Sequence, residues 1–199
     1  MKKLILIFLS ISLFAFTINK NEYFATVEKV ADVPVFIFSK PVSEYEIVGK
    51  AMSFGDMIKM ATDEKSTIRQ KTEKIVKTAH KRVKNNKISD FDALIIELEN
   101  DKIFAIKFKS EISQKAKIDN YDDIPIFFFC EPNKEYNVIK ELAAEYSLRA
   151  EKRGMLIDKL NSMVKRTLKK RENKDVDYFD GIIINPDDLS EKLITFKNN

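Results

Sequence analysis

The 199-residue sequence is short of the residue types on which most enzymatic sites depend, with one cysteine, one histidine, four glycines and no tryptophan. Because Cys130 is alone, no disulfide can form within the chain, and we expect the thiol in the apolar core, with an intermolecular bridge as the alternative. A zinc site needs three or four ligands, so His80 alone predicts a solvated helix residue rather than a metal ligand. A cysteine-histidine nucleophile would require Cys130 and His80 to meet, which we do not expect, because Cys130 follows a run of apolar residues.

The sequence also lacks the motifs of common enzyme classes. It has no G-x-S-x-G turn, no phosphate-binding loop and no glycine-rich dinucleotide turn. The glycines stand alone, at positions 49, 55, 154 and 181, so backbone cradles for phosphate are not expected. We therefore predict a non-enzymatic protein with no catalytic residue, no cofactor and no metal site.

Several aspartates cluster along the chain, and we expect most of them in caps and turns. No cluster has the alternating oxygen ligands, central glycine and closing glutamate of a calcium loop. Asp92 and Asp180 differ, because each precedes an apolar strand at a corresponding place. We expect each to accept backbone hydrogen bonds, and a two-carboxylate enzyme site is the alternative. The clusters are Asp119, Asp122 and Asp123; Asp175, Asp177 and Asp180; and Asp187 with Asp188.

The first residues predict export. Residues 1–17 combine two lysines with an apolar run over 4–16, and they place the small residues Ala15 and Thr17 before a suitable cleavage point. The run is short for a membrane helix, although an uncleaved anchor is the alternative. Nothing later approaches the roughly 18 consecutive apolar residues of a membrane helix. We expect an exported protein, periplasmic or extracellular, with no membrane span after signal cleavage.

The formal charge is close to balanced. It is +4 for the whole chain, and loss of Lys2 and Lys3 with the signal would leave +2. Such a mixture argues against nucleic acid as a partner. The strongest basic run follows Val164, and the solvated face of an amphipathic helix is its favoured interpretation; contact with phosphates or anionic lipid headgroups is the alternative. This run contains Lys165, Arg166, Lys169, Lys170 and Arg171.

One segment of the sequence occurs twice. Positions 32–50 share seven identities with the residues 91 positions later, where about one or two would be expected by chance. A shift of 88 then aligns 91–96 with 179–184. We therefore predict two related units, 18–109 and 123–199, joined by a linker over 110–122. The identities are Asp32/Asp123, Pro34/Pro125, Phe36/Phe127, Phe38/Phe129, Pro41/Pro132, Glu44/Glu135 and Tyr45/Tyr136.

Each unit is predicted to have the order ββαββ, which gives an α+β fold of two antiparallel sheets, each with one amphipathic helix packed on a face. The first strand, 33–38, is apolar throughout and should be covered on both faces, and the second, 45–51, should return beside it. The segment 23–27 is either an edge strand or a tether. Asn85-Asn86 should end the first helix. The other expected strands are 92–99, 103–109, 124–129, 136–142, 180–185 and 193–197. The expected buried helix stripes are Ile68, Thr72, Ile75, Val76, Ala79 and Val83, then Leu156, Leu160, Met163, Val164 and Leu168.

Tyr45 and Tyr136 occupy equivalent places, each after a glutamate. We expect them to pack over a sheet edge, and a paired groove for a partner is the alternative. The motif Tyr45-Glu46-Ile47-Val48-Gly49, followed by a helix and by Asp92-Ala93-Leu94-Ile95, resembles the bacterial heavy-metal-binding domains and the related fold of outer-membrane stress-sensor lipoproteins. That resemblance implies metal binding and ring-like assembly. The two-copy arrangement with an export signal also resembles exported proteins of Bacteroidetes type, which implies no particular activity.

Clear fold signals without a catalytic set favour an exported, non-enzymatic binding or structural module of the bacterial cell envelope. The alternative, which follows from the resemblance, is a metal- or small-ligand-responsive envelope sensor. The expected partner is an envelope protein or a second copy of the chain. The candidate partner surface comprises Tyr45, Tyr136, Lys165, Arg166, Lys169 and Lys170.

Overall fold

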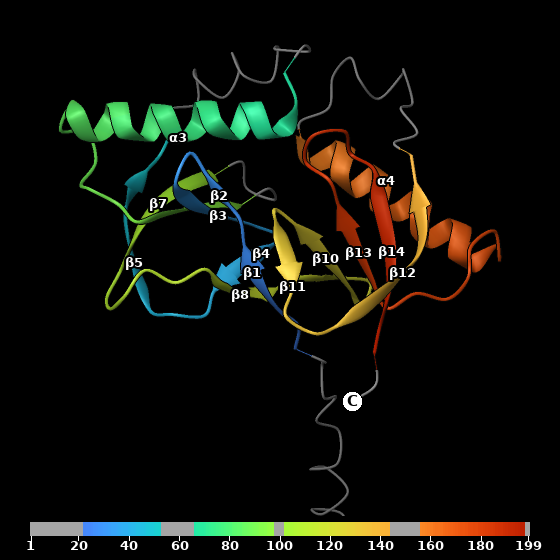
Figure 1. Cartoon of the computed structure of the whole chain (residues 1–199). Helices are drawn as coiled ribbons and strands as arrows, with labels where there is room; N and C mark the ends of the chain where they lie inside the picture. Colours follow the sequence, from blue (N-terminus) through green and yellow to red (C-terminus); the bar gives the residue numbers. More distant parts are fainter. Residues whose placement is uncertain (1–21, 53–65, 98–101, 144–155, 198–199) are drawn as a thin grey trace, which may run out of the picture.

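The computed structural model describes residues 22–52, 66–97, 102–143 and 156–197, including their side chains except those of 156–161 (Figure 1). Within these residues the fold is α+β, with two helices and three sheets. The first half comprises β1 (Phe24–Val27), β2 (Lys29–Val30), β3 (Val33–Ile37), β4 (Ser39–Pro41), β5 (Tyr45–Lys50), α3 (Ile68–Lys84), β6 (Ala93–Glu97) and β7 (Lys102–Phe108). The second half comprises β8 (Lys115–Ile118), β9 (Asn120–Tyr121), β10 (Ile124–Phe128), β11 (Cys130–Pro132), β12 (Tyr136–Leu142), α4 (Leu156–Glu172), β13 (Gly181–Ile184) and β14 (Glu191–Phe196).

Two of the sheets have five strands each. Their strand orders are β2-β3-β6-β7-β5 and β9-β10-β13-β14-β12. In each sheet one pair is parallel, β3 with β6 and β10 with β13, and the other pairs are antiparallel. The two sheets are therefore mixed.

The prediction of antiparallel sheets, with 45–51 beside 33–38, was wrong. Strand β5 pairs with β7 at the sheet edge, and β3 lies between β2 and β6. Phe38 and Phe129 explain the change, because their positive φ angles of 52° and 56° end β3 and β10 and redirect the chain out of each sheet. The next strand, β4 or β11, then joins the third sheet instead of returning beside its predecessor.

The third sheet has four strands, in the order β11-β1-β8-β4, and combines strands of both halves. At its centre β1 and β8 pair antiparallel, with the fully buried Ala25 opposite the fully buried Ala116. The sequence predicted either an edge strand or a tether for the segment 23–27. The structure instead makes it an inner strand of this sheet. The interpretation of 110–122 as a linker was also wrong, because it contains β8 and β9. Exposed lysines alternate with buried apolar residues in β8, so its short period is easily missed.

Two-residue hairpin turns explain why Asp32 recurs as Asp123. Ala31 and Asp32 join β2 to β3 with φ angles of 47° and 66°, and Asp122 and Asp123 join β9 to β10 with 48° and 63°. Two consecutive positive φ angles define the type I′ hairpin turn, in which aspartate is tolerated. The expectation that Asp122 and Asp123 lie in a turn is confirmed.

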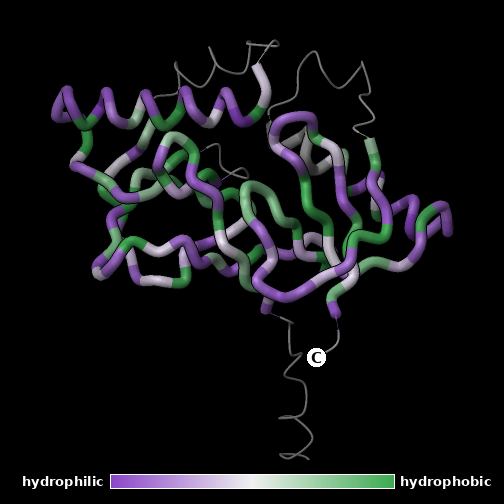
Figure 2. Tube along the Cα trace, in the orientation of Figure 1, coloured by the Kyte–Doolittle hydropathy of each residue, from purple (hydrophilic) through white to green (hydrophobic). Residues whose placement is uncertain are grey.

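The core is arranged in layers (Figures 1 and 2). Every residue of β3 and β10 is buried, which confirms that 33–38 begins a strand covered on both faces. Ile37 and Phe128 belong to a cluster that includes the apolar faces of both helices. Phe36 and Phe127 belong to a second cluster, which they share with residues of the four-stranded sheet. Each cluster contains residues of both halves, so the halves share their core.

Both helices have the predicted apolar stripe. In α3 the buried residues include Ile75, Val76 and Ala79, and in α4 Met163, Val164 and Leu168 are buried. The start of α3, which the sequence left open, is fixed by a capping box in which Thr67 and Gln70 bond each other's backbone N–H groups. Asn85 and Asn86 follow its end, as predicted. Leu156 and Leu160 lie among the residues whose side chains are not described.

Arg69 at the start of α3 fastens the first half to the second. Its guanidinium pairs with Glu28 at 3.0 Å and with Asp187, between β13 and β14, at 2.9 Å, and it lies 5.2 Å from the centre of the Phe129 ring. Partial burial lowers its pKa, but the hydrogen bonds to Asp187 and Glu28 outweigh that effect, so the pKa is raised. The arginine therefore stays charged and joins three segments. Among the described helices, neither is both long and apolar enough to span a bilayer.

Candidate functional site

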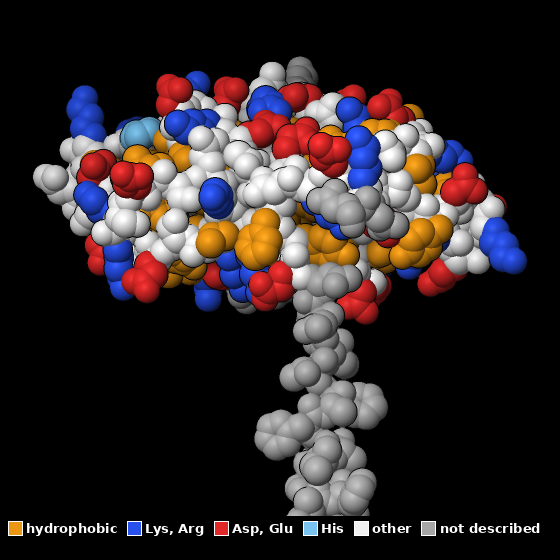
Figure 3. All heavy atoms as spheres, turned by 60° about the horizontal axis from the view of Figure 1, so that its bottom comes forward, with side chains coloured by type: hydrophobic (Ala, Val, Ile, Leu, Met, Phe, Trp, Pro, Cys, Tyr) orange, Lys and Arg blue, Asp and Glu red, His pale blue; other side chains and the backbone are white. Residues whose placement is uncertain are grey.

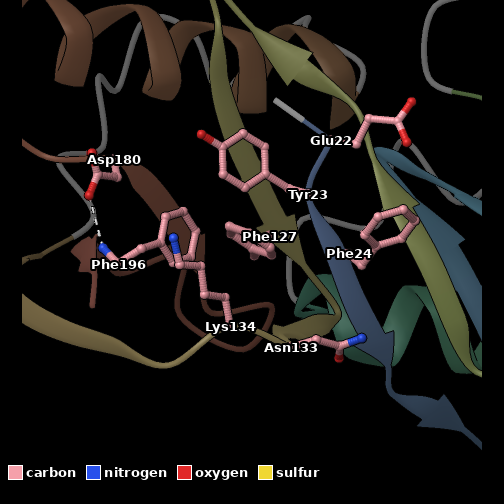
Figure 4. Close-up of a pocket in the computed structure, with 8 residues that line it drawn as sticks. All are labelled: Glu22, Tyr23, Phe24, Phe127, Asn133, Lys134, Asp180 and Phe196. Atoms are coloured by element: carbon pink, nitrogen blue, oxygen red, sulfur yellow. Dashed lines mark hydrogen bonds between the residues drawn. The ribbon is translucent and has the colours of Figure 1, made fainter. Parts of the chain in front are cut away.

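A pocket of about 480 Å³ lies where the two ends of the described chain meet (Figure 4). Residues at the start of β1 form one side, and the end of β14 forms the other. The turn between β11 and β12 closes the pocket, and β10 provides its floor. The pocket is lined by Glu22, Tyr23, Phe24, Phe127, Asn133, Lys134, Asp180 and Phe196.

Aromatic rings form the apolar part of the pocket. The Tyr23 ring stacks on Phe196 with centroids 5.3 Å apart and an interplanar angle of 22°. Phe127 meets Phe196 edge-on at 6.2 Å, and the Phe24 side chain is 42% exposed. Because Tyr23 precedes β1 and Phe196 ends β14, the stack exists only after the chain ends have been brought together.

Polar groups surround the rings. The Lys134 ammonium lies 5.4 Å from the centre of the Phe196 ring, within cation–π range, and makes no ion pair with a described residue. The Asn133 side-chain oxygen accepts a hydrogen bond from the Thr26 hydroxyl at 2.9 Å, which leaves its amide N–H groups to donate to a ligand. Glu22 pairs with Lys117.

Asp180 is held at the pocket by β14. Its carboxylate accepts a hydrogen bond from the backbone N–H of Phe196 at 2.9 Å, and its own N–H donates to the Ile194 carbonyl at 2.7 Å. Asp92 does the same in the first half, with the Phe108 N–H at 2.9 Å and the Ile106 carbonyl at 2.8 Å. The expectation that both aspartates accept backbone hydrogen bonds is confirmed. Asp92 does not line the pocket, so the pocket does not join the two carboxylates.

The corresponding place in the first half has different side chains. It keeps the edge-on ring pair, Phe36 with Phe108 at 6.5 Å. Gln114 lies 91 positions after Tyr23, and the two residues make reciprocal bonds: the Ile118 N–H donates to the Tyr23 carbonyl, and the Val27 N–H donates to the Gln114 carbonyl. The Gln114 amide donates to the Val27 carbonyl at 2.7 Å and presents no ring. At a shift of 91, Val42 and Ser43 take the places of Asn133 and Lys134.

Tyr45 and Tyr136 lie outside the pocket. Each is half-buried at the start of an edge strand and packs against the core cluster of the four-stranded sheet, which matches the expected packing role. The Tyr136 hydroxyl donates to Glu131 at 3.0 Å, and burial, followed by the Glu131 contact, raises the pKa of Tyr136. The two tyrosines begin strands of different sheets, β5 and β12.

The basic run of α4 and the single histidine lie on helix surfaces. Lys165 and Lys169 are exposed, and Arg166 and Lys170 are half-buried. His80 is exposed and packs its ring 4.9 Å from Phe91, so the prediction of a solvated helix residue is confirmed. Within the described ranges, no three or more His, Cys, Asp or Glu side chains come together as a metal site would require.

The turn between β13 and β14 accounts for the last acidic pair. Asp187 binds Arg69, as described above. Asp188 accepts hydrogen bonds from the Ser190 N–H at 2.9 Å and from its hydroxyl at 2.7 Å, and these bonds lower the pKa of Asp188. A third carboxylate, Glu191, is buried in β14 and accepts from the Thr167 hydroxyl of α4. These contacts explain the acidic residues as parts of turns and packing.

Cys130 is a buried free thiol in the second core cluster, as predicted. Burial raises the pKa of the Cys130 thiol from 9.0 to about 12. We expect the thiol of the folded chain to react with a disulfide reagent at least about a hundredfold more slowly than in denaturant, because the thiolate is the reactive form. The folded state keeps the proton to higher pH than the unfolded chain does, so stability should fall as pH rises above about 9. Equal labelling rates with and without denaturant would contradict this placement.

Sequence reasoning missed the pocket. Tyr23 stood in a segment of undecided structure, and Phe196 stood in the expected strand 193–197. No local motif joins them, because their contact depends on the pairing of β1 with β8 and β11. Comparison of the chain with protein-family models, with curated proteins and with solved structures gives no match.

Proposed function

We propose that this chain is an exported, non-enzymatic binding module of the cell envelope, built from two copies of one ββαββ segment. Three features support the duplication. The elements of the two halves follow in the same order, and both contain one parallel strand pair. Positive φ angles recur 91 residues apart at Phe38 and Phe129, and at the two hairpin turns. Phe36 and Phe127 share one core cluster, and Ile75 and Met163 share the other.

The asymmetry of the pocket carries the proposal of binding. Where two copies share a framework, packing residues keep the same places, as Phe36 and Phe127 do. Tyr23, Asn133 and Lys134 depart from this equivalence together, and all three line one pocket. In Tyr23 an aromatic ring stands where the other half has the half-buried amide of Gln114, and substitutions gathered around one pocket in this way are typical of a ligand site on a rigid scaffold.

The lining indicates the class of ligand. Stacked rings offer an apolar face, while Lys134 and Asn133 donate hydrogen bonds and Asp180 and Glu22 accept them. A ligand that matches both parts of the pocket must have an apolar ring face, together with hydroxyl or amide groups at its edge. We propose a saccharide of the cell envelope. Both carboxylates already have partners, Phe196 N–H and Lys117, so they orient the ligand rather than act as an acid–base pair.

Replacement of Tyr23 by alanine tests this function. Removal of the stacking ring should weaken saccharide binding by about tenfold to a hundredfold, because burial of ring surface and ring stacking together contribute about 2 kcal/mol. Calorimetry of the full chain with N-acetylglucosamine, its oligomers and glucose measures this change.

The matched control is Gln114→Ala, 91 positions after Tyr23, which should alter affinity less than about twofold. A full chain that binds none of these saccharides, or equal losses in the two variants, would contradict the proposal. Thermal unfolding of both variants shows whether any loss arises from a change in stability.

A further inference from the structure

We propose that the two helices form a basic face that docks on anionic phospholipid headgroups. This proposal depends on the proposed export to the envelope but not on the saccharide pocket. Helix α3 contains seven Lys and Arg residues and one Glu, and α4 contains six Lys and Arg residues and two acidic ones. The helices thus carry ten excess positive charges, while the whole chain carries +4, so the rest of the molecule is net negative.

The fold places exposed lysines of both helices on their outer faces, whereas Arg69 of α3 is paired with Glu28 and Asp187. The apolar faces of both helices enter the same core cluster, which lies across the five-stranded sheets from the cluster of the four-stranded sheet. The outer faces of α3 and α4 therefore point away from the four-stranded sheet (Figure 1). A different face, turned forward in Figure 3, instead carries acidic and basic side chains side by side, with apolar side chains between them.

The exposed lysines recur at equivalent places. Lys77 and Lys81 of α3 lie 88 positions before Lys165 and Lys169 of α4. All four are exposed, and within the described residues none makes a hydrogen bond or an ion pair with its side chain. Lysines four residues apart lie on one helix face, about 6 Å apart along the axis. The two ammonium groups of each pair therefore repel each other unless an anion lies nearby.

The shape of the face identifies the partner. The lysines project outward from two helix surfaces and do not converge on one point, which suits an extended array of charges rather than a single small anion. Neither helix contains a Phe, Tyr or Trp on which bases could stack, the His80 ring of α3 packs against Phe91, and no large apolar side chain of the described helix residues is exposed. These features fit contact at the level of lipid headgroups without insertion of apolar side chains.

The test compares sedimentation of the full chain with vesicles of phosphatidylcholine alone and of phosphatidylcholine mixed with phosphatidylglycerol. The apolar residues 4–16 can contribute to binding of both kinds of vesicle. The difference in affinity between neutral and anionic vesicles therefore reports on charge. We expect at least about tenfold stronger binding to the anionic vesicles, with a steep loss on addition of salt.

Matched charge removals locate the surface. Each Lys contributes about fivefold to binding near an anionic bilayer, so Lys77→Gln with Lys81→Gln, or Lys165→Gln with Lys169→Gln, should each weaken anionic binding by about 25-fold. The control, Lys40→Gln with Lys115→Gln, removes the same charge from the exposed side of the four-stranded sheet. It should weaken binding to anionic vesicles less than about threefold.

Three results would overturn the proposal: equal binding to neutral and anionic vesicles, equal losses in the helix and control variants, or tighter binding to duplex DNA than to anionic vesicles. The last would identify a nucleic acid as the polyanionic partner. Tyr23→Ala should leave vesicle binding unchanged, so failure here is distinguishable from failure of the saccharide site.

Discussion

Replacement of Phe36 by alanine is expected to lower the free energy of unfolding by about 3–5 kcal/mol. Phe36 is fully buried in β3, and its ring meets Phe108 edge-on at 6.5 Å in the core cluster between β3 and the four-stranded sheet. Removal of the ring leaves a cavity among side chains that are themselves held by β-sheet pairing, so the surroundings cannot collapse into it. For a chain of this length, such a loss corresponds to a fall in melting temperature of roughly 6–20 °C.

Chemical denaturation followed by circular dichroism and by tyrosine fluorescence measures this effect. Because both core clusters contain residues of both halves, we expect one transition, shifted as a whole by Phe36→Ala. Ile112→Ala is the control, since Ile112 is 58% exposed, and it should cost less than about 1 kcal/mol. Two transitions, of which Phe36→Ala shifts only one, would show that the halves fold separately.

Replacement of Gly49 by valine is expected to cost about 2–5 kcal/mol. Gly49 has a φ of 156° at a register shift between β5 and β7, and an added Cβ would lie 2.5 Å from Ile88 Cγ2 and 3.0 Å from its Cβ. Ile88 packs against the helix-side core, so it cannot move away freely. Backbone strain and overlap therefore act together at this position.

The second half provides the control for Gly49. Strand β12 has a register shift at the equivalent place, where Lys140 is exposed and donates to the Asp175 carbonyl at 3.3 Å. Lys140→Val should change stability by less than about 1 kcal/mol, and Ile88→Ala should restore part of the stability that Gly49→Val loses. Equal costs for Gly49→Val and Lys140→Val would contradict the contact with Ile88.

Local patterns predicted the elements better than their pairing. The apolar run at 33–38 and the helix stripe through Ile75 and Ala79 were sufficient, because burial on two faces or on one stripe leaves a direct mark on the sequence. Pairing depends on where the chain turns, and the positive φ angles of Phe38 and Phe129 leave no such mark, because phenylalanine rarely adopts that conformation. The prediction of antiparallel sheets was wrong for this reason, and the linker was wrong because the alternation in β8 spans only four residues.

For the candidate sites, too, local features could be predicted from the sequence, whereas contacts between distant segments could not. Asp92 and Asp180 could be assigned from the sequence, because their recurrence before a strand indicates a local hydrogen bond. The pocket could not be assigned, because Tyr23 meets Phe196 only through the four-stranded sheet. For the proposed basic face, the sequence identified the basic run of α4 as a candidate partner surface, but it did not show that α3 presents lysines at equivalent places on the same side of the sheets.

The saccharide pocket is tested most directly by the aromatic-ring NMR spectrum of the full chain during titration with N-acetylglucosamine oligomers. Saccharide binding at this site should shift the ring signals of Tyr23 and Phe196 together until they saturate, while those of Phe36 and Phe108 stay in place. Saturating shifts of Phe36 and Phe108 without shifts of Tyr23 and Phe196, or no saturating shift in either pair, would contradict the proposed saccharide site.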